Sequence, residues 1–194
     1  MVLLREARER SDARLVDDCR EGDASAFDEI VRRYKDRVYN VVYRFLGNHE
    51  DALDVSQEAF VRAYRGVEGF RGGSQVYTWL YSIAANLARN RLRDSTRKGR
   101  NMGTSLEAMV TPPAVNAQRT PRSEAEGHEL DETLQACLNE LPEHYRVAFV
   151  LRTFDDLSYD EIAETLDCPK GTVKSRINQA RRLLRERLEA LSLV

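Results

Sequence analysis

Hydrophobic residues recur every three or four positions along most of the first half of the chain, with polar residues between them. Over 23–47 the apolar side chains at these steps are Phe27, Ile30, Val31, Tyr34, Val38, Val41, Val42 and Phe45. This period predicts amphipathic helices. The same pattern predicts helices over 49–67 and 76–94, and Gly47 with Asn48 is a typical end for the first helix. No stretch alternates with period two over the length of a strand, so we expect essentially no sheet.

The helical pattern lapses between residues 95 and 127. This segment contains three of the chain's five prolines, several glycines and little that could form a core. Such a composition is typical of a linker. Helical periodicity returns over 128–194. The sequence therefore predicts an all-α protein of two small helical domains, 11–94 and 128–194, joined by a flexible linker over 95–127.

The stretch LSYDEIAETLDCPKGTVKSRINQAR, which begins at Leu157, has the pattern of a helix-turn-helix. Ser158 followed by Glu161 predicts a capping box at the start of the first helix. The residues CPKG then supply a turn, with Pro169 suited to a first helical position. The second helix carries a narrow apolar stripe: Val173, Ile177, Ala180 and Leu184. The opposite face is polar and cationic: Ser175, Asn178, Gln179 and Arg182, flanked by Lys174 and Arg185.

Side chains of these kinds form hydrogen bonds with base edges and phosphates in DNA. A helix N-terminus also favours a phosphate group. The alternative is a solvated, arginine-rich surface helix in a helical bundle. The capping box, the turn chemistry and the polar face agree in register, which favours the DNA-binding interpretation.

The net charge of −2 is unlike that of a sequence-independent nucleic-acid binder, which is normally clearly basic. The charges are segregated along the chain, however. Residues 89–100 are mostly basic, 155–167 carry only acidic charges, and 170–187 are again mostly basic. Separate acidic and basic patches indicate at least two kinds of partner.

Composition excludes several other classes of protein. Hydrophobic residues make up 42% of the 194 residues and charged residues 32%, which is typical of a soluble globular chain. No apolar run approaches the roughly 20 residues of a membrane span, and the first twelve residues are too polar for a signal peptide. We therefore expect a cytoplasmic protein without direct membrane insertion.

Metal and catalytic chemistry are also not expected. Cys19, Cys137 and Cys168 lie far apart, so neither a disulfide framework nor a zinc site is indicated. The three histidines occupy unrelated positions, and no nucleophile–base pair accompanies them. We expect no catalytic residue, no metal, no cofactor and no small-molecule substrate; the protein is expected not to be an enzyme.

Three motifs in order along the chain carry a family resemblance. DALDVSQEAFVRAY begins at Asp51, FRGGSQVYTWLYSIAAN begins at Phe70, and the helix-turn-helix follows the linker. Together they resemble the sigma-70 family of bacterial RNA polymerase initiation factors, in its extracytoplasmic-function (ECF) class. The resemblance covers nearly the whole chain, with the linker in the expected place. It implies core RNA polymerase, through its β′ and β subunits, and promoter DNA as partners, together with an inhibitory anti-sigma protein.

The first motif resembles the segment of the family that docks on a coiled coil of the β′ subunit. The resemblance implies that the following residues bind core polymerase: Asp54, Gln57, Glu58, Phe60 and Val61. Carboxylates suit this role as acceptors for arginine on the partner. The alternative for Asp54 and Glu58 is an ordinary solvated helical turn.

The second motif resembles the segment that melts and holds the −10 promoter element. The residues implied are Phe70, Arg71, Ser74, Trp79, Asn86, Arg89, Asn90, Arg91 and Arg93. Melting leaves bases unstacked, and an aromatic side chain recovers about 1–3 kcal/mol per stacked base. Arginine and asparagine on the following helix would hold phosphate. Trp79 has an equally good interpretation as a core residue.

The third motif resembles the segment that binds the −35 element as intact duplex. The residues implied are Lys170, Thr172, Lys174, Ser175, Arg176, Asn178, Gln179 and Arg182. Two promoter elements two helical turns apart lie on the order of 70 Å from each other, and the linker can reach about 100 Å when extended. The linker can span that distance but cannot fix it, so we expect the free factor not to bind promoters until polymerase recruits it.

Two other kinds of protein remain as alternatives. A dimeric helix-turn-helix regulator would bind an operator without polymerase, but it gives no purpose to the glycine-aromatic loop and basic helix of the first domain. A protein-interaction module would leave the arginine-rich polar face of the last helix unexplained. Association with core polymerase separates both alternatives from a sigma factor.

Overall fold

The computed structural model describes residues 10–70, 72–102 and 121–191, with side chains throughout except at 95–102 and 121–130. The helices are α2 (Asp12–Arg20), α3 (Ala24–Leu46), α4 (His49–Gly66), η1 (Val67–Gly69, a 3₁₀ turn), α5 (Val76–Met102), α6 (Pro121–Glu140), α7 (Glu143–Thr153), α8 (Tyr159–Thr165) and α9 (Lys170–Ala190). These ranges contain no strand. The predicted all-α class is therefore confirmed.

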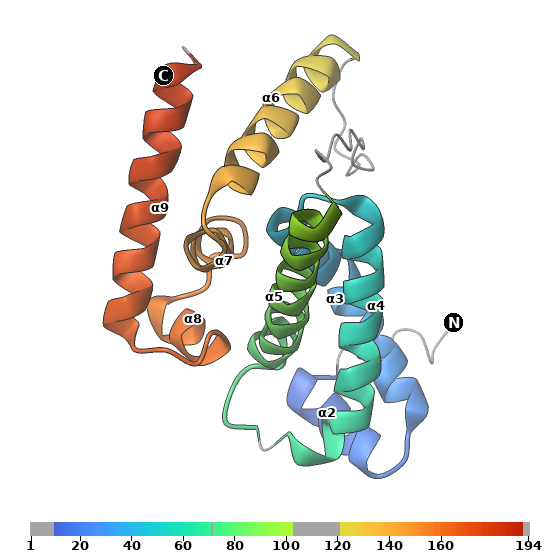
Figure 1. Ribbon diagram of the computed structural model, residues 1–194. Helices are drawn as coiled ribbons and strands as arrows, with labels where there is room; N and C mark the ends of the chain where they lie inside the picture. The colour runs from blue at the N-terminus through green and yellow to red at the C-terminus, as the bar shows by residue number, and fades with distance from the viewer. Residues whose placement is uncertain (1–9, 71, 103–120, 192–194) are drawn as a thin grey trace.

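The N-terminal half packs α3, α4 and α5 around one core, with α2 against α3 (Figure 1). The fully buried side chains at its centre include Ile30, Val38, Val41, Phe45, Ala52, Ala63, Leu80 and Tyr81. Helix α3 ends where predicted, because Gly47 adopts a left-handed φ of 69° and its N–H donates to the Tyr43 carbonyl at 2.7 Å. Asn48 then caps α4, its Oδ1 accepting from the Asp51 N–H at 2.9 Å.

The C-terminal half packs α6 to α9 together, and its buried side chains belong to the same hydrophobic cluster as those of the N-terminal half. Its fully buried side chains include Leu138, Leu151, Leu157, Ile162, Val173, Ile177 and Ala180. The N-terminus of α7 follows Pro142, whose extended backbone precedes the first helical turn. Each half therefore buries the apolar positions that its periodicity predicts.

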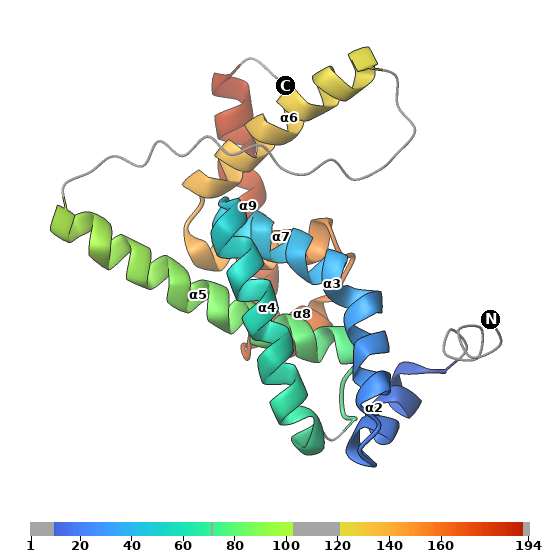
Figure 2. The same cartoon turned by 90° about the vertical axis from the view of Figure 1, so that its right-hand side faces the viewer.

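Helical structure extends into both ends of the predicted linker. Helix α5 continues to Met102, and its C-terminal end projects away from the other helices (Figure 2). Arginine and lysine are good helix formers, so a helix can continue where apolar periodicity has stopped. Helix α6 begins at Pro121, a residue suited to the first turn. The rest of the predicted linker, 103–120, lies outside the described residues, and the domain boundaries stay a prediction.

The two halves lie in contact, which the sequence analysis does not anticipate. Helices α3 and α5 of the first half contact α6, α7 and α8 of the second, and α8 lies between α5 and α9 (Figure 1). At Gly47 the halves approach closely, since an added Cβ would lie 2.3 Å from Oδ1 of the Asn139 side chain of α6. The left-handed φ of Gly47 favours glycine at this position.

A buried carboxylate fixes the start of α3. Glu29 is 7% exposed and accepts hydrogen bonds from Arg32 Nε at 2.7 Å and Arg33 Nε at 2.8 Å. The hydrogen bonds from Arg32, together with those from Arg33, lower the pKa of Glu29 to about 2. Arg33 also pairs with Asp12 at 2.9 Å, which ties α2 to α3.

We predict that Glu29→Gln destabilises the fold at pH 7 by about 2 kcal/mol, because a charge-assisted pair is lost. The folded pKa lies below the unfolded one, so the stabilisation is complete above the unfolded pKa near 4.5 and is lost as pH falls toward 2. Urea unfolding followed by circular dichroism between pH 7 and pH 3 measures this. The difference between the two proteins should shrink as pH falls; a difference that is constant with pH would contradict the assignment.

Candidate nucleic-acid and partner-binding surfaces

The helix-turn-helix forms as the sequence predicts. Ser158 Oγ accepts from the Glu161 N–H at 3.2 Å, and the Ser158 N–H donates to Glu161 Oε2 at 2.7 Å, which completes the capping box. The turn depends on Asp167, whose φ of 48° reverses the chain. Pro169 precedes the second helix in an extended conformation, so α9 begins one residue later than the predicted proline position, at Lys170.

Helix α9 has a buried face and a solvent face in the predicted register. The whole apolar stripe from Val173 to Leu184 is buried. The predicted −35 residues on the solvent face are Lys170, Lys174, Ser175, Asn178, Gln179 and Arg182. Arg182 donates to Gln179 Oε1 at 3.1 Å and pairs with Glu186 at 2.7 Å. These contacts align the long side chains along one exposed face of α9, where they are accessible to a groove of DNA.

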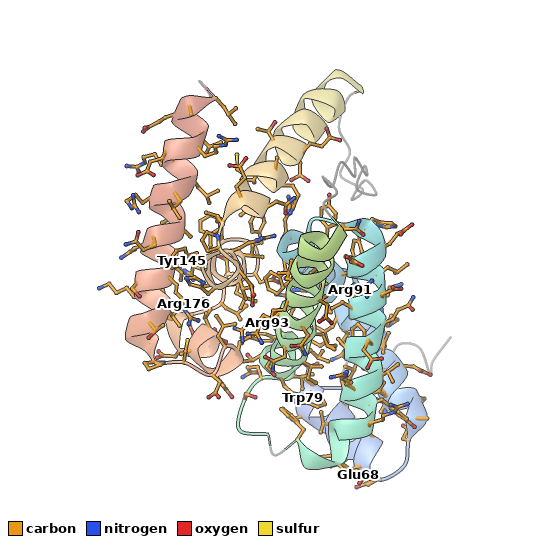
Figure 3. The ribbon with its side chains drawn as sticks, viewed as in Figure 1. Glu68, Trp79, Arg91, Arg93, Tyr145 and Arg176 are labelled. Atoms are coloured by element: carbon orange, nitrogen blue, oxygen red, sulfur yellow. The ribbon has the colours of Figure 1, made fainter. Side chains whose placement is uncertain are left out.

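Two predicted −35 residues lie apart from this face. Thr172 is half-buried, and its carbonyl accepts from Ser175 Oγ at 2.9 Å. Arg176 is half-buried and lies toward α5 (Figure 3), with Nη1 3.7 Å from Cys168 Sγ. Arg176 is therefore separate from the outward-facing residues of α9, because it lies beside the buried stripe that includes Ile177.

Helix α4 presents an exposed stripe that combines acidic, amide and apolar side chains. The α4 stripe consists of Leu53, Asp54, Gln57, Glu58, Val61 and Tyr64. The Asp54 side chain is 71% exposed, and Val61 is 42% exposed. Glu58 pairs with Arg62 of the same helix at 2.8 Å. Four of the five predicted polymerase-binding residues therefore lie together on one solvent face.

The fifth, Phe60, lies apart from this face, and its role in polymerase binding stays a prediction. It is only 9% exposed and belongs to the core, because its position falls on the same side of α4 as Ala59 and Ala63. The structure instead adds Leu53 and Tyr64 to the stripe, at 44% and 52% exposure. A signal for both exists in the sequence: they are large apolar residues out of register with the buried positions of α4.

The glycine-aromatic loop is anchored by an aromatic pair. Phe70 is 7% exposed, and its ring centroid lies 4.8 Å from that of Trp79, which is half-buried. The Phe70 ring is therefore covered by another ring in this structure, and its role in holding the −10 element stays a prediction. Gly72 provides the left-handed turn with a φ of 69°. Ser74 is half-buried, and the side chain of Arg71 lies outside the described residues.

After the loop, α5 carries polar side chains that face solvent. Asn86, Asn90, Arg91 and Arg93 are exposed. Arg91 donates to Asp51 of α4 through Nε at 2.7 Å and lies 3.9 Å from Asp54 (Figure 3), so the basic side of α5 adjoins the α4 stripe. The predicted −10 and polymerase-binding residues of the first half are thus neighbours.

Arg89 differs from the other predicted phosphate-binding residues of α5. It is half-buried, and its Nε lies 3.5 Å from Glu143 of α7, in the other half of the chain. Burial lowers the pKa of its guanidinium, although Glu143 opposes that shift. The guanidinium group of Arg89 is therefore already paired with a carboxylate in this structure.

Among the described residues, no three His, Cys, Asp or Glu side chains are grouped closely enough to hold a metal ion. Within the same ranges, every helix is too short or too polar to cross a membrane. The described residues form a helical protein with a helix-turn-helix in the C-terminal half and an exposed stripe of acidic and apolar side chains on α4 in the N-terminal half.

Comparison with known proteins identifies the family. The family model for Sigma-70 region 2 matches residues 30–98, and that for Sigma-70 region 4 matches residues 131–184. The ECF RNA polymerase sigma-E factor of Haemophilus influenzae is 37% identical over 188 residues, covering 95% of this chain and 99% of that protein. The ECF RNA polymerase sigma factor SigW of Bacillus subtilis is 38% identical over 180 residues, covering 89% of this chain and 94% of that protein.

Solved structures agree on the fold. The sigma factor RpoE from Bartonella quintana, in complex with the anti-sigma factor NepR, matches with a TM-score of 0.69 at 24% identity, covering 84% of this chain and 96% of that chain. CnrH, in complex with the cytosolic domain of CnrY, matches with a TM-score of 0.66 at 24% identity, covering 91% of this chain and 96% of that chain.

This chain belongs to the ECF class of the sigma-70 family of RNA polymerase sigma factors. The family resemblance in the sequence is thereby confirmed, and the dimeric operator-binding regulator is set aside.

Proposed function

We propose that this sigma factor binds core RNA polymerase through the α4 stripe, recognises the −35 element as duplex with α9, and holds the melted −10 element with the loop after η1 and with α5. The observation that carries the proposal is that the α4 stripe and the outer face of α9 are both solvent-exposed and lie on different halves of one chain. Such a chain can hold the polymerase and a promoter at the same time.

The α4 stripe suits a protein partner better than DNA. Asp54 and Glu58 would repel phosphate but would accept hydrogen bonds from arginine on a partner. Leu53, Val61 and Tyr64 add exposed apolar surface to the same face. Apolar and aromatic side chains beside charged ones are typical of an interface with a few energetically dominant contacts.

The outer face of α9 suits duplex DNA. Asn178 and Gln179 are exposed side by side, and an amide side chain can form two hydrogen bonds with adenine in the major groove. Lys174 and Arg182 flank them and can neutralise phosphates. Ser175 completes this group of hydrogen-bonding side chains.

For the −10 element, Ser74, Asn86, Asn90, Arg91 and Arg93 have accessible positions in this structure. Phe70 and Trp79 cover each other, so either ring can stack on a base only after the loop moves. Arg89 likewise becomes available to phosphate only when Glu143 leaves it.

Regulation and location belong to the proposal as well. We infer that the chain acts in the cytoplasm as an initiation factor with no catalytic activity of its own, and that an anti-sigma protein controls it. The solved RpoE relative was captured with an anti-sigma factor, which supports the last point.

The polymerase-binding role is tested by Asp54→Arg. Reversing this exposed charge should lower affinity for core polymerase at least tenfold, because an arginine partner would then meet a like charge. Affinity is measured by fluorescence anisotropy of labelled factor titrated with core enzyme. The control is Asp36→Arg, the same charge change at an exposed position on α3. Equal loss in both variants, or loss in neither, would contradict the assignment.

The −35 role is tested by Asn178→Ala. A lost amide–base contact should change the preferred base at one −35 position, with discrimination reduced about tenfold, while affinity for core polymerase stays unchanged. The measurement is run-off transcription by reconstituted polymerase on a promoter library randomised at −35. Asn40→Ala, at an exposed site on α3, is the control. An unchanged base preference, or a loss of core binding, would reject the role.

A further inference from the structure

Three side chains on the outer face of α9 are joined end to end by polar contacts. Arg182 donates from Nε to Gln179 Oε1 at 3.1 Å, and its Nη1 lies 2.7 Å from Glu186 Oε1. Residues three and four positions apart are neighbours on a helix surface, so the three side chains form one row. All three residues are exposed, and they lie on the face that the proposed function assigns to duplex DNA. We call Gln179, Arg182 and Glu186 the α9 relay.

Glu186 lies too far along α9 to contact the same base as Gln179. The seven positions between them correspond to about 10 Å of helix, at a rise of about 1.5 Å per residue. One base step occupies only about 3.4 Å along the DNA axis. The carboxylate of Glu186 also repels phosphate, so this residue is not itself a DNA ligand. Any influence of Glu186 on how that base is recognised therefore passes through Arg182.

Arg182 is held at two points, and its orientation is fixed as a result. A guanidinium group is planar and carries five N–H donors in fixed directions. Its Nε hydrogen is directed at the Gln179 amide, and its Nη1 is directed at the Glu186 carboxylate. The pair with the carboxylate is charge-assisted and is the stronger of the two contacts. Glu186 therefore orients Arg182, and the remaining N–H groups of Arg182 stay available for a phosphate.

The contact from Arg182 determines what the Gln179 amide presents to DNA. A free amide can present either its accepting oxygen or its donating NH₂ group, because it can rotate. In the α9 relay Oε1 already accepts from Arg182, and the positive charge beside it opposes the approach of a second hydrogen-bond donor. The same hydrogen bond polarises the amide and strengthens its NH₂ group as a donor. Gln179 therefore presents a donor.

A fixed donor distinguishes among the bases in the major groove. Guanine presents N7 and O6 as acceptors, thymine presents O4, and adenine presents N7. Cytosine presents only its N4 amino group, which is itself a donor. An amide that is held as a donor thus finds an acceptor on three of the bases and a second donor on cytosine. An amide that rotates freely accepts from cytosine as well, and this distinction is lost.

We propose that the α9 relay sets the base preference of this sigma factor at one −35 position, where Gln179 acts as a hydrogen-bond donor that rejects cytosine. Arg182 and Glu186 are positioning residues, which hold the amide without contacting the base. The inference rests on the proposed function, since it requires α9 in the major groove of the −35 element. It adds Glu186 to the residues that determine promoter choice and gives Arg182 a role besides phosphate binding.

The test is run-off transcription by reconstituted polymerase, at one salt concentration, on a promoter library randomised at −35. Gln179→Ala identifies the relevant position, as the one where this variant loses the wild-type base preference. The measured quantity is the ratio of transcripts from promoters with guanine or thymine at that position to transcripts from promoters with cytosine. A general loss of DNA affinity leaves this ratio unchanged, because phosphate contacts carry no direct sequence information.

The wild type should disfavour cytosine about tenfold at this position. Glu186→Ala and Arg182→Met should each reduce the discrimination to about threefold or less, because the amide is then free to rotate. Glu186→Ala should have no further effect in a protein that already carries Gln179→Ala, since the relay acts only through the amide. Glu189→Ala is the matched control: it removes the same charge from an exposed position on the same helix, and it should keep the wild-type ratio.

The proposal is overturned by a wild type that accepts cytosine equally, by an unchanged ratio in Glu186→Ala, or by the same change in Glu189→Ala. A further effect of Glu186→Ala in the protein that lacks Gln179 would also overturn it, because the role would then be general. So would a Gln179→Ala variant with the wild-type preference at every position. Failure of the proposed function would appear differently, as a −35 preference that neither Gln179→Ala nor Asn178→Ala alters.

Discussion

The buried carboxylate of Asp155 decides how the two halves of this chain are placed. A carboxylate with little exposure is stable only when donors surround it, and here those donors, Arg37 and Tyr81, belong to the other half. The buried hydroxyl of Tyr81 has the reciprocal need, and burial, with this hydrogen bond, raises its pKa. Each half therefore supplies hydrogen-bond partners for polar groups that are buried in the other half. The contacts at the end of α3 also hold the two halves together.

This constraint explains how an acidic chain can carry so much positive charge. Most basic residues of α9 face solvent, whereas Arg37 and Arg89 are paired with Asp155 and Glu143 of the other half. Charge that is segregated along the sequence is thus partly neutralised within the fold, and the surfaces left exposed differ in sign. The α4 stripe is acidic and apolar, and the outer face of α9 is cationic and amide-rich. In the proposed account the first is for the polymerase and the second for duplex DNA.

Features that depend on local chemistry could be predicted from the sequence. The capping box of Ser158 and Glu161, the end of α3 at Gly47 and the buried stripe of α9 all follow from residues within a few positions of each other. The burial of Phe60 and Phe70 could not be predicted from the motifs, because a motif match does not indicate which side of a helix or loop a ring occupies. The contact of Arg37 with Asp155 could not be predicted, since neither residue has a periodic pattern that points to a partner more than a hundred positions away.

The proposed function requires that the two halves, which lie in contact in the free chain, separate when core polymerase and a promoter are bound. Single-molecule energy transfer tests this most directly, with dyes placed through non-natural amino acids at Glu68, after α4, and Glu189, near the end of α9, so that the native cysteines remain. The account predicts one compact population for the free chain and a longer separation once core polymerase is bound, because promoter elements two helical turns apart lie on the order of 70 Å from each other. A free chain that already shows the longer separation, or one that keeps the compact separation on polymerase, would contradict it.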